Sequence, residues 1–273
     1  GEAVLPDIAA ALNEKLEEKQ IPKDEVEGIG VGVPAPVTAE GVVNGSANLG
    51  WKYKEAKKEL EELTGMKATF GNDANVAALG EMWKGGGAGC KNLVMVTLGT
   101  GVGGGIIVDG KVVAGFNGAG GEIGHITVNH DEIEACNCGQ YGCLEQYTSA
   151  TGIVRLAKRK LAKSSEETSI REIPNLTAKD VFDAAKAGDT IAIGLVDEVC
   201  EILGSTLSNI ACVVNPEIIV IGGGVSKAGD ILLDNIKKHF VETAFMACRD
   251  TKFALAGLGN DAGMYGCVEM LLD

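Results

Sequence analysis

The fold is indicated most clearly by residues 93–108, whose sequence is Leu93-Val94-Met95-Val96-Thr97-Leu98-Gly99-Thr100-Gly101-Val102-Gly103-Gly104-Gly105-Ile106-Ile107-Val108. The apolar runs 93–98 and 104–108 predict two strands, and the glycine-rich segment between them predicts the turn that joins them. Strands joined by a short turn are antiparallel. Elsewhere the chain alternates strands with helices, so we expect an α/β protein whose sheet is mixed and not purely parallel.

The rest of the chain follows the same alternation. Apolar spacing predicts helices at 4–16, 53–63, 73–82, 145–161, from 178 onward, at 190–214, 231–240 and 262–272. It predicts strands at 26–33, 68–70, 111–114, 217–221 and 252–256, a short hairpin at 37–43 and a loop at 47–51. Residues 117–142 have no long periodic run and are expected to be irregular.

Composition excludes several classes of protein. The 273 residues are 45% hydrophobic and 23% charged, which excludes a disordered chain, and the 39 glycines follow no triplet period, which excludes collagen. The net charge of −14 argues against a nucleic acid or an anionic membrane as partner. No transmembrane segment or signal peptide is evident. The uneven spacing of eight cysteines argues against a disulfide framework and favours a reducing cytoplasm.

The densest group of chemically active residues is a cysteine cluster. Cys136, Cys138 and Cys143 lie within eight residues, and His125 lies eleven residues before the first of them. One histidine and three cysteines form the ligand set of a closed tetrahedral zinc site. Inert buried thiols are the alternative interpretation, and His130 is an alternative fourth ligand.

Asn72 and Asp73 lie between a predicted strand and a predicted helix. Both residue types favour the N-cap of a helix, so capping is the simpler interpretation of either one. The end of a strand is also where an α/β protein places a general base, and Asp73 is therefore a candidate catalytic carboxylate.

Two glycine-rich turns follow predicted strands. Backbone N–H groups at 97–105 could bind an anion, although a plain hairpin explains the same pattern. Gly222, Gly223 and Gly224 follow the strand at 217–221 and match neither the Walker A loop nor the dinucleotide fingerprint. Glu122 and Glu145 flank the cysteine cluster. Each alone is more simply a solvated surface residue, but a metal in that loop would also fix the direction of Glu145.

Together these stretches resemble the ROK family of sugar kinases (repressors, open reading frames, kinases), and within it the bacterial glucokinases. The resemblance covers nearly the whole chain, and the cysteine motif is its most specific part. It is carried by residues 48–51, 71–75, 98–105, 121–125, 136–145, 221–226 and 258–263.

The resemblance implies a two-domain, actin-like (ribonuclease H-like) α/β fold with a cleft between the domains. The small domain would comprise residues 1–73 plus 259–273, and the large domain residues 74–258 with the zinc loop. Family members also carry an Asp-Leu-Gly-Gly-Thr strand around the ATP phosphates. No such motif occurs here, and we expect those strands to be absent from the small domain of this chain.

The family's activity would then be ATP-dependent phosphorylation of the glucose 6-hydroxyl, with ATP, Mg²⁺ and a structural Zn²⁺. The resemblance implies the following roles: Asp73 as catalytic base; Asn48, Asn72, Glu122, His125 and Glu145 as sugar ligands; Thr100, Gly101, Gly222, Gly223 and Gly224 beside ATP; and His125, Cys136, Cys138 and Cys143 as zinc ligands.

Three alternatives stay open. The first is a kinase for N-acetylglucosamine, N-acetylmannosamine or fructose, and the second is a sugar-responsive transcription regulator. The third is a sugar-binding chain without catalysis. A regulator of this family would carry a helix-turn-helix, which the sequence does not show, and the net charge of −14 opposes DNA binding. A homodimer or homotetramer is expected from the family.

Overall fold

A computed structural model describes residues 1–46 and 48–272 of the chain. The α-helices are α1 (Val4–Lys19), α2 (Ala56–Thr64), α3 (Asp73–Lys84), α4 (Glu145–Thr148), α5 (Ala150–Lys163), α6 (Ala178–Lys186), α7 (Thr190–Val214), α8 (Asp230–Thr243) and α9 (Ala262–Leu272). The strands are β1 (Ile29–Val33), β2 (Val43–Ser46), β3 (Trp51–Lys54), β4 (Ala68–Asn72), β5 (Leu93–Leu98), β6 (Val102–Val108), β7 (Lys111–Val112), β8 (Ile218–Gly222) and β9 (Lys252–Leu255).

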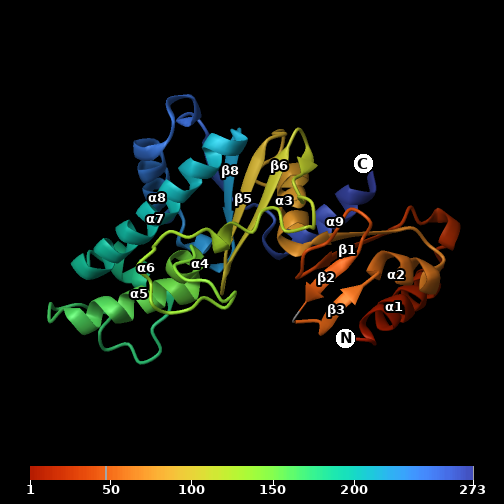
Figure 1. Cartoon of the computed structure of the whole chain (residues 1–273), viewed down its shortest axis with the longest axis horizontal. Helices are drawn as coiled ribbons and strands as arrows, with labels where there is room; N and C mark the ends of the chain where they lie inside the picture. The colour runs from red at the N-terminus through yellow and green to blue at the C-terminus, as the bar shows by residue number, and fades with distance from the viewer. Residues whose placement is uncertain (47, 273) are drawn as a thin grey trace.

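The elements gather into two halves (Figure 1). One half contains β5, β6 and β8 with helices α4 to α8, and the other contains β1, β2 and β3 with α1 and α2. Helices α3 and α9 lie between the halves and pack against each other, and α9 also contacts β1 and β4. The chain therefore has the mixed α/β architecture that the alternating pattern predicts.

The larger half is built on a five-stranded sheet with the order β7-β6-β5-β8-β9. β5 is antiparallel to β6 but parallel to β8, so the prediction of a mixed sheet is confirmed. Successive side chains of a strand point to opposite faces. Val94 and Val96 accordingly belong to the core shared with α7 and α8, whereas Leu93 and Met95 pack toward α3. Both faces of the central strands are covered, which explains their largely apolar sequence.

The smaller half holds two short sheets. β1 and β4 are parallel, and β2 and β3 form an antiparallel hairpin. Residues 48–50 form a turn, as predicted for the loop at 47–51, although Trp51 already belongs to β3. The prediction of a helix from residue 53 is wrong, because β3 occupies 51–54 and α2 begins only at Ala56. Trp51 is buried and donates its indole N–H to the carbonyl of Gly1 at 2.8 Å, which fixes this strand to the N-terminus. Ala47 lies outside the described residues.

Two predicted boundaries also change. The helix expected at 145–161 is interrupted at Ser149, whose hydroxyl accepts the N–H of Gly152 at 3.0 Å and starts a new helix, α5. The strand expected at 26–33 begins only at Ile29. Helices α7 and α9 have the predicted bounds, 190–214 and 262–272. Within the described ranges, no helix combines the length and apolarity needed to cross a bilayer.

The position of α3 depends on two glycines. A Cβ atom on Gly80 would lie 2.0 Å from the carbonyl oxygen of Ala262, and one on Gly266 would lie 1.6 Å from that of Val76. Only glycine permits this approach of α3 and α9. The approach sets the first turn of α3, at Asp73, beside the ends of the strands of both halves.

Candidate active site

A cleft of about 630 Å³ opens where β4, β5 and β8 end. The carboxyl ends of strands in α/β proteins are the usual place for a ligand. The cleft is lined by Pro34, Ala35, Pro36, Gly45, Ser46, Asn48, Asn72, Asp73, Ala74, Ala77, Thr97, Gly99, Gly101, Val102, Gly103, Glu122, Glu145 and Gly223. It thus brings together seven of the predicted site residues, from both halves of the molecule.

Asn72 is the residue that caps α3. Its side-chain oxygen accepts the N–H groups of Ala74 and Asn75 at 3.0 and 3.2 Å, and its amide donates to the carbonyl of Ala35 at 3.3 Å. These bonds leave one N–H of the Asn72 amide for a ligand. Asp73 is exposed in the cleft, and only its Oδ1 is engaged, by the N–H of Ala74 at 2.8 Å. Because Asn72 provides the cap, capping does not account for Asp73.

The glycine-rich turn between β5 and β6 borders the same cleft. Gly101 and Thr97 line it, whereas Thr100 is exposed outside the lining, and its carbonyl accepts the hydroxyl of Thr151 at 2.7 Å. The N–H of Ala150 donates to the carbonyl of Gly99 at 2.8 Å. The turn is therefore attached to the start of α5.

Of the three glycines at the end of β8, only Gly223 reaches this cleft. Its φ of +84° and a distance of 2.5 Å from its hypothetical Cβ to the carbonyl oxygen of Leu98 exclude any side chain. Gly222 is buried as the last residue of β8 and lines neither the cleft nor the pocket described next. Gly224 lines that second pocket.

The second pocket, of about 260 Å³, lies between α6 and the turn after β8. Its lining comprises Ala150, Thr177, Ala178, Lys179, Phe182, Asp183, Lys186, Gly224, Val225, Lys227 and Ala228. Its charged lining residues are three lysines and Asp183, which is paired with Lys179. Sequence reasoning missed these residues because α6 alone is an ordinary amphipathic helix, and only the fold brings it to Gly224.

Glu122 and Glu145 reach the cleft from the irregular segment and from α4. The side chain of Glu145 is 16% exposed. Its Oε2 accepts the N–H of Val102 at 3.4 Å, and its Oε1 accepts the thiol of Cys136 at 2.9 Å. His125 does not line the cleft, but its Nδ1 lies 3.9 Å from Glu145 Oε1.

The predicted metal ligands converge in the structure. The ligand atoms of His125, Cys136, Cys138 and Cys143 lie within 4.8 Å of one another, and His130 is not among them. Cys138 Sγ and Cys143 Sγ are 3.7 Å apart, and Cys136 Sγ is 3.9 Å from His125 Nδ1. Zn–S bonds of about 2.3 Å in a tetrahedron place sulfur atoms about 3.8 Å apart. The cluster therefore fits zinc.

The four predicted metal ligands differ in their exposure to solvent. Cys136 and Cys143 are buried, whereas Cys138 and His125 are exposed. Burial raises the pKa of the Cys136 thiol, and its hydrogen bond to Glu145 raises it further. None of the eight cysteines, all of which lie in the described ranges, forms a disulfide.

Comparison with known proteins identifies the family. Residues 2–273 match the model of the ROK family. The chain is 46% identical to a glucokinase of Halalkalibacterium halodurans, over 97% of this chain and 82% of that protein. It is 32% identical to a ROK glucokinase of Streptomyces griseus solved with glucose and AMPPNP, with a TM-score of 0.78 over 99% of this chain and 88% of that one.

A ROK transcriptional regulator, a homologue of the Escherichia coli MLC protein, superposes with a TM-score of 0.86 at 26% identity. The match covers 99% of this chain and 68% of the regulator. The same fold therefore occurs in kinases and in a regulator, and the identity with the two glucokinases is higher. The chain belongs to the ROK family.

Proposed function

We propose that the protein is a glucokinase that transfers the γ-phosphoryl group of ATP to the 6-hydroxyl of glucose. One observation carries the proposal: a single cleft holds an exposed carboxylate at a helix N-terminus, two further carboxylates and a glycine-rich turn of backbone N–H groups. The 46% identity to a protein named glucokinase supports glucose as the substrate.

Asp73 is the proposed general base. Its Oδ2 carries no hydrogen bond within the described chain, and the residue lines the cleft. A carboxylate in this position accepts the proton of the sugar hydroxyl as the oxygen attacks phosphorus. Phosphoryl transfer needs little covalent help, so positioning of the hydroxyl and the phosphate does most of the catalytic work.

The proposed sugar ligands surround Asp73. Asn48, Asn72, Glu122 and Glu145 line the cleft and offer amide donors and carboxylate acceptors for hydroxyl groups. His125 would bind the sugar through one ring nitrogen and the metal through the other. Its Nδ1 lies 3.9 Å from both Glu145 Oε1 and Cys136 Sγ, so the imidazole lies beside a proposed sugar ligand and beside the metal cluster.

The proposed nucleotide site extends from the turn to the second pocket. Thr100 and Gly101 would border the phosphates, and Gly222, Gly223 and Gly224 would let the adenosine lie close to the backbone. The two cavities share this side of the fold, with Gly223 in one and Gly224 in the other. Mg²⁺ bound with ATP would neutralise negative charge on the transferred phosphoryl group.

Zinc is the proposed structural metal at His125, Cys136, Cys138 and Cys143. Zinc would hold its four ligands at fixed distances and so restrain the segment 125–145. We further propose the division into a small domain (1–73 plus 259–273) and a large one (74–258). The packing of α9 against β1 and β4 supports assigning this helix to the small domain, and its more extensive packing against α3 forms the junction with the large domain. A homodimer or homotetramer and a cytoplasmic location stay predictions.

The substrate is tested by measuring the melting temperature and ATP-dependent phosphorylation with glucose, N-acetylglucosamine, N-acetylmannosamine and fructose. A sugar that binds only the folded state raises the melting temperature, and the rise grows with affinity. Glucose, as the proposed substrate, is expected to raise it most. If N-acetylmannosamine stabilises the protein and glucose does not, the proposed substrate is wrong, but the family assignment is unaffected. Stabilisation without any phosphorylated product would favour a sugar-binding protein over a kinase.

A further inference from the structure

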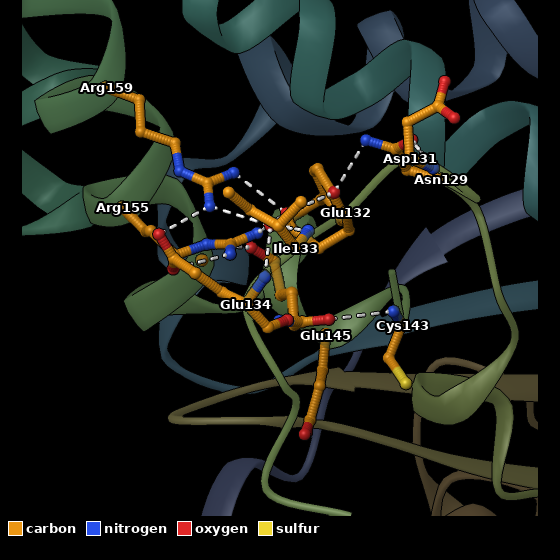
Figure 2. Close-up of polar contacts among 12 residues, drawn as sticks. Asn129, Asp131, Glu132, Ile133, Glu134, Cys143, Glu145, Arg155 and Arg159 are labelled. Carbon is orange, nitrogen blue, oxygen red and sulfur yellow. Dashed lines mark hydrogen bonds and ion pairs between the residues drawn. The ribbon is translucent and has the colours of Figure 1, made fainter. Parts of the chain in front are cut away.

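Glu132 is a buried carboxylate that does not line the cleft. Its side chain is 1% exposed. Arg155 donates to Oε2 at 2.9 Å, and Arg159 donates to both carboxylate oxygens at 2.9 and 2.8 Å (Figure 2). A buried carboxylate is costly unless it is paired and fully hydrogen-bonded. Both arginines come from α5, so this carboxylate joins the irregular segment to that helix.

The same carboxylate also binds its own loop. Oε1 accepts the N–H groups of Ile133 and Glu134, both at 3.0 Å. Oε2 accepts the hydroxyl of Tyr147 at 2.6 Å. The hydrogen bond from Arg159 is the largest of the effects that hold the pKa of Glu132 far below its usual value. Glu132 is thus the centre of a network of charge-assisted bonds, which are the stronger kind.

Gln146 connects this network to the site. Its carbonyl accepts Arg155 Nε at 3.2 Å, and its side-chain amide donates to the carbonyl of Glu134 at 2.9 Å. Its side-chain oxygen accepts the N–H of Cys143, a predicted zinc ligand, at 3.1 Å. Gln146 follows Glu145 directly. A shift of Gln146 would therefore move both Glu145, a proposed sugar ligand, and Cys143, a predicted metal ligand.

We infer that Glu132 is a positioning residue for hexose binding: through Arg155, Glu134 and Gln146 it holds Glu145 and the cysteine loop in the geometry that the sugar requires. This inference rests on the proposed function. Glu132 has no role in the chemical step, and the nucleotide pocket lies beyond the network. The effect of its loss is expected in sugar affinity and not in nucleotide affinity.

The test compares two substitutions of well-bonded carboxylates. Glu132→Gln keeps the shape and removes the charge. Asp189→Asn likewise keeps the shape and removes the charge, at the N-cap of α7. Asp189 accepts hydrogen bonds from Thr168, Ser169 and Ala192, and it does not line the cleft. Glucose and AMPPNP affinities are measured by calorimetry on zinc-loaded proteins, below the melting temperature of every variant.

Glu132→Gln is expected to weaken glucose binding about 10- to 100-fold and to leave AMPPNP affinity unchanged. An effect of this size is usual when a side chain that orients a ligand-binding residue is lost. Asp189→Asn is expected to lower the melting temperature and leave glucose affinity intact. Normal glucose affinity in Glu132→Gln, or equal losses in both variants, would overturn the inference. If Glu132→Gln does not fold, Gln146→Met removes two side-chain bonds without unpairing a charge, and the same loss of glucose affinity is expected.

Hexose binding by the unsubstituted parent protein distinguishes a failure of this inference from a failure of the proposed function. If the parent binds another hexose of the panel, the ratio of affinities is measured with that sugar. If it binds none, the proposed function fails, and the network is then judged by the rate at which a chelator removes zinc. Glu132→Gln is expected to release zinc about 10-fold faster than Asp189→Asn. Equal rates would overturn the inference.

Discussion

Glu145 and Val102 are joined by a hydrogen bond of 3.4 Å from the backbone N–H of Val102 to Oε2 of the carboxylate. Val102 begins β6 directly after the glycine-rich turn, and Glu145 begins α4 directly after the cysteine loop. The other carboxylate oxygen accepts the thiol of Cys136 at 2.9 Å. One side chain therefore connects the proposed sugar, phosphate and metal regions.

This relationship predicts a specific effect of Gly101→Ala. A Cβ atom at position 101 would lie 2.6 Å from Glu145 Oε2, whereas the backbone there needs no left-handed φ. The carboxylate must move, and its bond to Val102 is lost, although the fold survives. We expect glucose affinity, measured by calorimetry, to fall at least about 10-fold.

Gly194→Ala is the matched control for that substitution. Position 194 is in α7, and the nearest atom to its Cβ would be Lys160 Nζ at 3.7 Å. Adding a methyl group there is expected to leave glucose affinity unchanged. If Gly101→Ala binds glucose as tightly as Gly194→Ala does, Glu145 is not a sugar ligand of the proposed kind.

Much of the larger half could be predicted from the sequence. Strands buried on both faces give largely apolar runs, as at 93–98 and 218–221, and the long apolar run of α7 predicts a buried helix. The metal cluster could be predicted because its ligands are close in the sequence. Asn72 and Asp73 could be located at a strand end, but only the hydrogen bonds distinguish the cap from the free carboxylate.

Other features depend on contacts between distant residues. β3 contains Trp51, Lys52, Tyr53 and Lys54, and its pairing with β2 outweighs a helical pattern that continues into α2. The second pocket exists because α6 packs beside Gly224. The pairing of Glu132 with Arg155 and Arg159 joins residues more than twenty positions apart, and no spacing rule predicts it.

The metal cluster predicts one zinc per chain, measured by elemental analysis. Cys138→Ser is expected to abolish zinc binding and to weaken glucose binding with it, because a structural metal orients the segment that carries its ligands. Cys138 is exposed, so the substitution itself disturbs no core packing.

Two substitutions control for this result. Cys212→Ser changes another exposed cysteine, on α7, and His130→Ala removes the alternative ligand that the structure leaves outside the cluster. Both are expected to retain one zinc. Loss of zinc from His130→Ala together with retention by Cys138→Ser would show that the ligand set is wrong.

Asp189 predicts a dependence of stability on pH. Burial works to raise the pKa of Asp189, but the N–H groups of Ala192 and Ser169 and two hydroxyls outweigh it and lower the pKa to about 2. A folded pKa below the ordinary value of 3.8 stabilises the protein above that pH. This contribution is lost as the pH falls from about 4 to about 2.

Urea unfolding of the parent and of Asp189→Asn measures this contribution. Because the variant has no carboxylate at position 189, we expect the parent to be more stable at pH 7 and the difference in unfolding free energy to shrink between pH 4 and pH 2.5. A difference that stays constant over this range would mean that the hydrogen bonds to Asp189 do not favour its charged form.

Asp73→Asn tests the proposed base. The substitution keeps the size of the side chain and, since Asn72 caps α3, leaves the cap unchanged. The turnover number for glucose phosphorylation is expected to fall at least about 10²-fold, because general base catalysis typically contributes 10²–10⁴. Glucose affinity should change much less, since an amide can still bond to the 6-hydroxyl.

Asp230→Asn is the control that separates catalysis from helix electrostatics. Asp230 is the first residue of α8, as Asp73 is of α3, and both are exposed. A carboxylate at this position stabilises a helix by about 0.3–1 kcal/mol through the macrodipole. Both variants should therefore lose a similar small amount of stability, measured by thermal unfolding, and only Asp73→Asn should lose turnover. A near-normal rate in Asp73→Asn would remove this carboxylate from the mechanism and leave Glu122 and Glu145 as the carboxylates of the cleft lining that could accept the proton.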